Sequence, residues 1–98
     1  MDIMRVVSDL VATRRVDGLR GLSLKVLADS KGRISVACDP VGVPPGEWVI
    51  ATKGSAARYA TGNAASLTDL TICGIIDDWD DGEGRSTRQE LKGAIANG

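Results

Sequence analysis

Short runs of alternating apolar and polar residues predict a protein built from β-strands. Such alternation is typical of a strand with one face in a core and the other face outside it. It occurs in Leu22–Val26 and Ile34–Cys38, and the turn residues Asp29–Gly32 between them predict a hairpin. Ile3–Thr13 is rich in apolar and β-branched residues and predicts a long first strand.

A fourth strand is expected to start at Glu47, because Trp48 and Ile50 fall on one face and Val49 and Ala51 on the other. Gly54 should end this strand. Ser55 is expected to act as the N-cap of one helical turn that ends at Arg58, in the sequence Gly54-Ser55-Ala56-Ala57-Arg58. Small side chains at such a corner indicate a close approach of backbone, and we predict that the corner surrounds a symmetry axis.

The last strand is expected over Thr68–Asp77, with apolar residues on both faces. In so small a protein, this pattern suggests burial against a neighbouring subunit as well as against the core. The three prolines and two glycines of residues 39–46 predict a stiff connection without regular structure. The sequence therefore predicts an all-β fold: a small, five-stranded, OB-like barrel with one short helix between the fourth and fifth strands.

The composition changes after this barrel. We predict a barrel domain over residues 1–79 and an acidic, glycine-rich tail over residues 80–98. Within the tail, Thr87 and Glu90 form the pattern of a capping box for a short helix. Gly93 lies in the middle of that helix and would weaken it.

The 98 residues carry 12 basic and 13 acidic side chains and no histidine. Balanced charge argues against a polyanion partner, since phosphate binding depends on basic residues. The lack of histidine removes the commonest general base and the commonest metal ligand. Cys38 and Cys73 lie in apolar strand patterns and are expected to be buried thiols. No signal peptide or membrane-spanning run is found, so we expect a cytoplasmic protein.

Three motifs could indicate metal binding, phosphate binding or catalysis. The acidic residues around Trp79 lack the spacing of an EF-hand. The loop Gly42–Gly46 lacks the Gly-Lys-Ser/Thr of a phosphate loop. Ser55 has no histidine to activate it. We therefore expect no catalytic residues, no cofactor and no metal.

The order and spacing of several segments resemble the EutN/CcmL family, the vertex proteins of bacterial microcompartment shells. The segments are Val11–Arg15, Asp39–Gly42, Gly46–Val49, Gly54–Arg58 and Asp69–Asp77. The last two are most similar to the vertex proteins of α-carboxysomes. Ser35–Pro40 is similar to the second of the two paralogues that those shells carry.

The resemblance implies a homopentamer that caps the vertices of a carboxysome shell, allowing hexamer-tiled sheets to close. Hexameric shell proteins would then be direct partners, and ribulose-bisphosphate carboxylase and carbonic anhydrase would be indirect cargo. The expected site residues fall into three groups: Gly54, Ser55, Ala56 and Ala57 around a pore on the five-fold axis; Arg58, Ile72, Ile75 and Trp48 at the subunit interface; and Thr13, Arg14 and Arg15 at the edge facing hexamers.

The sequence also permits other interpretations of Arg58 and of the function. Arg58 fits an ordinary surface arginine at a helix C-terminus as well as a bridge between subunits. An OB-like nucleic-acid-binding domain is the alternative function, but three scattered aromatic residues and balanced charge do not favour it. A third interpretation is an oligomer that holds a small molecule in the axial opening.

Overall fold

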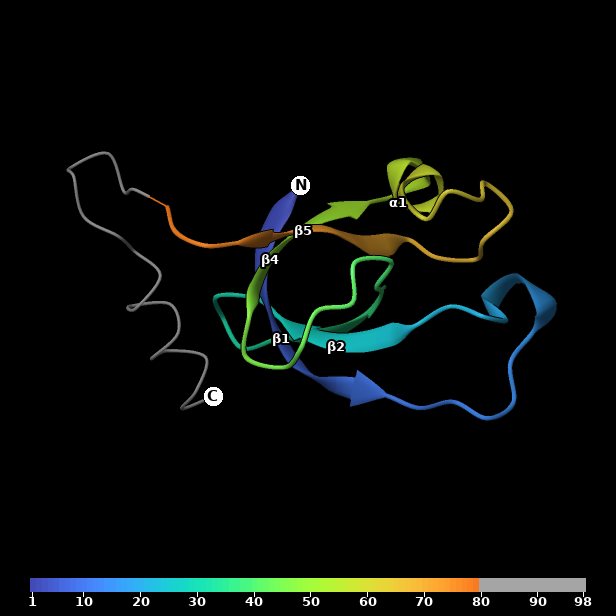
Figure 1. The fold of residues 1–98 in the computed structure, drawn as a ribbon, viewed down its shortest axis with the longest axis horizontal. Helices are drawn as coiled ribbons and strands as arrows, with labels where there is room; N and C mark the ends of the chain where they lie inside the picture. Colours follow the sequence, from blue (N-terminus) through green and yellow to red (C-terminus); the bar gives the residue numbers. More distant parts are fainter. Residues whose placement is uncertain (80–98) are drawn as a thin grey trace.

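The computed structural model describes residues 1–79, in which five strands close into a barrel (Figure 1). The elements in chain order are β1 (Asp2–Leu10), the 3-10 helix η1 (Asp17–Leu19), β2 (Leu24–Ala28), β3 (Ile34–Cys38), β4 (Trp48–Lys53), α1 (Ser55–Ala60) and β5 (Leu70–Ile76). The expected five-stranded barrel with one short helix between its fourth and fifth strands is thus confirmed.

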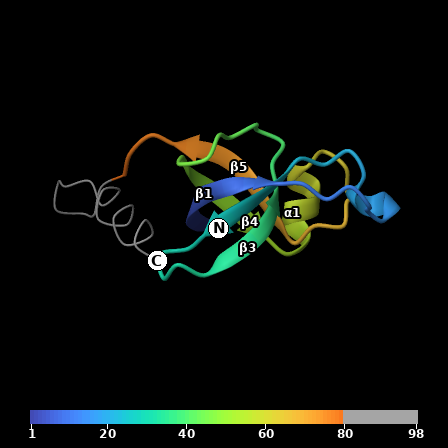
Figure 2. The ribbon, with the colours of Figure 1, turned by 90° about the horizontal axis from the view of Figure 1, so that it is seen from below.

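The strands follow one another around the barrel in the order β1-β2-β3-β5-β4, and β4 pairs again with β1. All neighbours are antiparallel except β3 and β5, which are parallel and joined by the single bridge Cys38↔Thr71. Figure 2 views the barrel from below and shows α1 and the β1–β2 loop at the same end. Neighbouring strands are therefore extensively paired except at the contact between β3 and β5, which is called the seam and has a single bridge.

Strand boundaries differ from the expected ones by a few residues. β1 ends at Leu10 rather than Thr13, and β2 is shifted two residues toward the C-terminus. The hairpin between β2 and β3 is as expected: Gly32 has a positive φ of 80°, and the Asp29 carboxylate accepts N–H bonds from Lys31 and Arg33. Desolvation opposes ionisation of Asp29, but these backbone hydrogen bonds prevail and lower its pKa.

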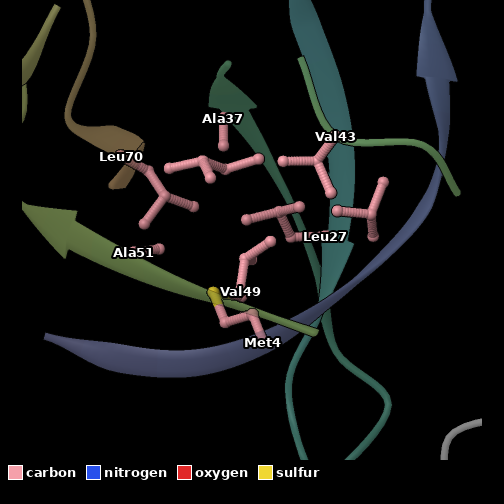
Figure 3. Close-up of a cluster of buried hydrophobic side chains, with 9 residues drawn as sticks. Met4, Leu27, Ala37, Val43, Val49, Ala51 and Leu70 are labelled. Atoms are coloured by element: carbon pink, nitrogen blue, oxygen red, sulfur yellow. The ribbon is translucent and has the colours of Figure 1, made fainter. Parts of the chain in front are cut away.

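The barrel interior is filled by medium and small side chains (Figure 3). The main cluster consists of Met4, Val6, Leu27, Ala37, Val43, Val49, Ala51, Leu70 and Ile72, all nearly or completely buried. Val49 and Ala51 belong to this cluster, whereas Trp48 and Ile50 do not, in agreement with the predicted alternation. Small side chains suit a five-stranded barrel because its interior is narrow.

Val43 reaches the core from the loop between β3 and β4, and Asp39 holds it there. The buried Asp39 carboxylate accepts N–H bonds from Val41, Gly42 and Val43, at 3.0, 2.8 and 2.7 Å. Lys25 Nζ lies 3.8 Å from the same carboxylate and also bonds Asp9. The hydrogen bond to Asp9 raises the pKa of Lys25, against the opposing effect of desolvation. This network fixes the loop in the conformation that places Val43 in the core.

A second apolar cluster lies outside the main core. Trp48 has no exposed surface and packs against Ala28, Ile76 and Trp79. The rings of Trp48 and Trp79 meet edge to face, with centroids 5.6 Å apart and planes at 66°. One apolar side of the last strand is therefore partly covered by the chain's own Trp79. The predicted boundary at residue 79 stays a prediction, and the expected tail lies outside the described residues.

The expectation of two buried thiols is half right. Both cysteines are free; Cys38 is buried, and its pKa is raised by burial and secondarily by the Asp39 charge. Cys73 is exposed. Cys73 faces away from the core because it follows the inward-facing Ile72 in the alternation of β5. It also lies at a bulge: Ile50 pairs with Gly74 and Ala51 with Ile72, so Cys73 has no cross-strand partner.

Replacing the buried carboxylate tests the role of Asp39. Asp39→Asn should lower the free energy of unfolding by about 1–3 kcal/mol, because the amide NH₂ would face the Val43 N–H. Urea unfolding measures this loss. Asp17→Asn, at an exposed ion pair with Arg20, is the matched control and should change stability by less than about 0.5 kcal/mol. Equal effects of the two changes would contradict the role of Asp39.

Removing Trp79 tests the second cluster. Trp79→Ala should lower stability by about 1–3 kcal/mol and shift the Trp48 emission to longer wavelength, because Trp48 would gain contact with water. Trp79→Phe keeps an aromatic edge and should retain most of the stability. Unchanged emission from Trp48 in Trp79→Ala would show that Trp79 does not shield it.

Candidate functional site

The corner between β4 and α1 depends on a glycine. Gly54 has φ 66° and ψ −145°, a conformation that side chains disfavour, and it is the N-cap of α1. The expectation that Ser55 is the N-cap is therefore wrong. Ser55 is already the first helical residue, and no side-chain hydrogen bond caps the helix. The glycine turns the chain so sharply that the helix starts one residue earlier than expected.

The six residues of α1 are too few for a stable helix on their own, so contacts with the barrel must hold it. The buried hydroxyl of Thr71 donates a hydrogen bond of 2.7 Å to the carbonyl of Ala57. The N–H of Gly54 donates one of 3.0 Å to the carbonyl of Asp69. Both ends of the corner are thereby fixed to the start of β5, and the corner is a rigid part of the barrel.

The expected pore residues differ in exposure. Gly54, Ser55 and Ala56 are exposed, whereas Ala57 is completely buried inside the subunit. Only the first three can present atoms to an opening. Arg58 is exposed, and no ion pair of its guanidinium occurs among residues 1–79.

The expected interface residues also separate into two groups. Trp48 and Ile72 have no exposed surface in the single chain, so any part they play in an interface is indirect, through the neighbours that they support. Ile75 is 43% exposed and can contact another subunit directly.

Two exposed apolar strips, which sequence analysis missed, lie on separate parts of the barrel wall. Strip A consists of Ile3 and Ile50, which are opposed in the pairing of β1 with β4. Strip B consists of Ile34 and Val36 on β3, which are 69% and 49% exposed. Around the barrel, β2 separates the strips on one side and β5 on the other. Alternation within each strand could have indicated the strips, but not how far apart they lie.

The β1–β2 loop carries the three residues expected to face hexamers. Thr13 and Arg14 are exposed. Arg15 is half-buried, and its guanidinium donates hydrogen bonds to the carbonyls of Ala12, Leu19 and Leu22. Arg15 therefore shapes the loop, and Thr13 and Arg14 are left to contact a partner.

The same loop packs against the segment that follows α1. Leu67 N–H donates to the Gly18 carbonyl at 2.9 Å, and a Cβ on Gly18 would lie 2.4 Å from Leu67 Cγ. A larger residue at position 18 would displace the Leu67 side chain from this contact. The loop expected to face hexamers and the segment after the corner are thus one connected surface.

The lysine that directly precedes the corner has an ion-pair partner. Asp2 and Lys53 are 2.7 Å apart, and the hydrogen bond from Lys53 lowers the pKa of Asp2. Within residues 1–79, no three cysteine, aspartate or glutamate side chains gather in a way that could hold a metal ion. In the same range, no helix is long and apolar enough to span a bilayer.

A closed barrel with a small-residue corner and two separate exposed apolar strips is suited to packing against further protein surfaces. The chain belongs to the EutN/CcmL family: the family described as "Ethanolamine utilisation protein EutN/carboxysome" matches residues 1–77.

Among its relatives, the carboxysome shell vertex protein CsoS4B of Halothiobacillus neapolitanus is 60% identical over 79 residues, covering 81% of this chain and 98% of the relative. CsoS4A of the same organism is 42% identical over 80 residues, covering 81% and 96%. The chain is therefore more similar to the B protein, which agrees with the resemblance of Ser35–Pro40 to one paralogue.

Solved structures give the same result. The structure of Halothiobacillus neapolitanus CsoS4B has a TM-score of 0.75 and 60% identity, covering 79% of this chain and 99% of that one. The GrpN pentameric microcompartment shell protein from Rhodospirillum rubrum has a TM-score of 0.71 and 32% identity, covering 82% and 98%.

The corner can be tested by adding one methyl group. Gly54→Ala should lower the free energy of unfolding by about 1–3 kcal/mol, because alanine disfavours this φ and ψ. Open space surrounds the added Cβ, so a clash is not the cause. Ser55→Ala is the control, and it should change stability by less than about 0.5 kcal/mol because Ser55 makes no cap. A greater loss in Ser55→Ala, measured by urea unfolding, would contradict this description of the corner.

Proposed function

We propose that this chain is a structural shell protein whose homopentamers cap the vertices of a carboxysome. The observation that carries the proposal is the match over the whole length of CsoS4B, at 60% identity and with the same fold. The nucleic-acid alternative has no support among the relatives.

The two apolar strips support a ring of identical subunits. In a closed ring each subunit presents two different surfaces, one to each neighbour. Strip A on β1 and β4 and strip B on β3 are two such surfaces. Exposed apolar side chains in rows favour burial by a partner. Five-fold units provide the curvature that a flat sheet of hexamers lacks.

The corner is proposed to surround the five-fold axis. Gly54, Ser55 and Ala56 are small and exposed, so copies of the corner can crowd together there. The opening would be lined by Ser55 hydroxyls and backbone groups, while Ala57 supports the corner from inside.

The β1–β2 loop is proposed as the edge that contacts hexameric shell proteins, through Thr13 and Arg14. Arg15 would maintain the shape of that edge. Ribulose-bisphosphate carboxylase and carbonic anhydrase would be enclosed cargo. No residue of this chain is assigned a direct contact with either enzyme.

Native mass spectrometry tests the proposal. The chain should have a mass near five times 10.2 kDa. Ile50→Asp places a charge in strip A and should dissociate the pentamer, because a buried unpaired carboxylate is strongly unfavourable. Val11→Asp, at an 85% exposed position of the β1–β2 loop, is the control and should leave the mass unchanged.

A monomeric wild-type chain would overturn the proposed function. A pentamer that persists in Ile50→Asp would keep the function but remove strip A from the subunit interface.

A further inference from the structure

Two opposite charges near the corner have no ion-pair partner within residues 1–79. They are the guanidinium of Arg58, in the last turn of α1, and the carboxylate of Asp69, just before β5. Both side chains are exposed. They line the same cavity of about 440 Å³, together with Gly54, Ser55, Leu67 and Thr68.

The backbone holds both charges on a rigid support. Asp69 accepts the hydrogen bond from Gly54, and Thr71 binds the carbonyl of Ala57, which directly precedes Arg58. Although Arg58 and Asp69 share one cavity, they form no ion pair in the single chain. Their side chains are thus presented outward from fixed positions.

Another cation that could pair with Asp69 within the subunit already pairs with a different carboxylate. Lys53 is the other cation beside this carboxylate, since both line a second cavity with Ser35 and Val36. Lys53 bonds Asp2 at 2.7 Å. Of the two cations that line these cavities, Arg58 is the one without an ion pair among residues 1–79, and its planar group can bind a carboxylate through two N–H groups at once.

We infer that Arg58 of one subunit binds Asp69 of the next around the ring. This inference rests on the proposed function, which places copies of the corner beside one another. Every interface of a closed ring is the same, so the one contact would be repeated at each. The ion pair would mainly fix the relative position of neighbouring corners, and it would contribute less to the affinity between subunits.

The test uses the single variants Arg58→Asp and Asp69→Arg, each of which puts like charges at every interface. Each should raise the protein concentration at which half of the chain is pentameric by about tenfold or more. Lys31→Asp makes the same charge change as Arg58→Asp, at an exposed turn between β2 and β3, and should have no such effect. Circular dichroism checks that each variant folds.

Two rescues then distinguish a contact between subunits from one within a subunit. The double variant with both changes should assemble, because opposite charges meet again. A mixture of the two single variants should also assemble when neither does alone, since alternating subunits bring opposite charges together at the interfaces. In a ring of five, one interface must keep like charges, so this rescue should be incomplete.

The results of these experiments distinguish the Arg58–Asp69 contact from the proposed vertex function. Single variants that remain pentameric, or a double variant that stays dissociated, would overturn the Arg58–Asp69 contact without affecting the vertex role. Rescue by the double variant but not by the mixture would place the pair within one subunit and overturn the inference. A wild-type chain that is not pentameric would instead overturn the proposed function itself.

Discussion

The closing contact between β3 and β5 is the constraint on which the other features depend. Only the bridge Cys38↔Thr71 joins these strands, and each side of it organises a different region. Asp39, next to Cys38, folds the following loop so that Val43 enters the core. Thr71 binds α1 through its hydroxyl. The β3–β5 contact therefore lies between the loop that places Val43 in the core and the hydroxyl that holds α1. The β3–β4 loop and α1 both add contacts beside this bridge, which helps so small a barrel to stay closed.

Much of the fold could be predicted because alternation and turn chemistry are local properties. The β2–β3 hairpin follows from the strand pattern and from the turn residues after Asp29. The bulge at Cys73 could not be predicted in the same way, because a bulge depends on the register between two distant strands. The N-cap was misplaced since a glycine with a positive φ replaced the side-chain cap that serine usually supplies. Composition alone does not distinguish these two starts of a helix.

The β4–α1 corner was predicted from the sequence as a local structure, but the burial of its side chains was not. The small residues of the corner were apparent in the sequence, but burial of Ala57 depends on how α1 lies against β5. Trp48 and Ile72 were expected at a subunit interface, yet they lie inside the subunit, because apolar residues on both strand faces can also be covered by the same chain. The Asp39 network and the Asp69 carboxylate were missed, although Asp-Pro-Val-Gly is a sequence in which an aspartate can bind the following backbone N–H groups.

The Trp48–Trp79 contact has a consequence for how this chain can be lengthened. β5 runs from the end of the barrel that carries α1 and the β1–β2 loop toward the opposite end, and residues 77–79 follow it in the sequence (Figures 1 and 2). The family match ends at residue 77. Sequence joined after Trp79 therefore starts far from the corner and from the β1–β2 loop, so it can vary without altering the contacts of either.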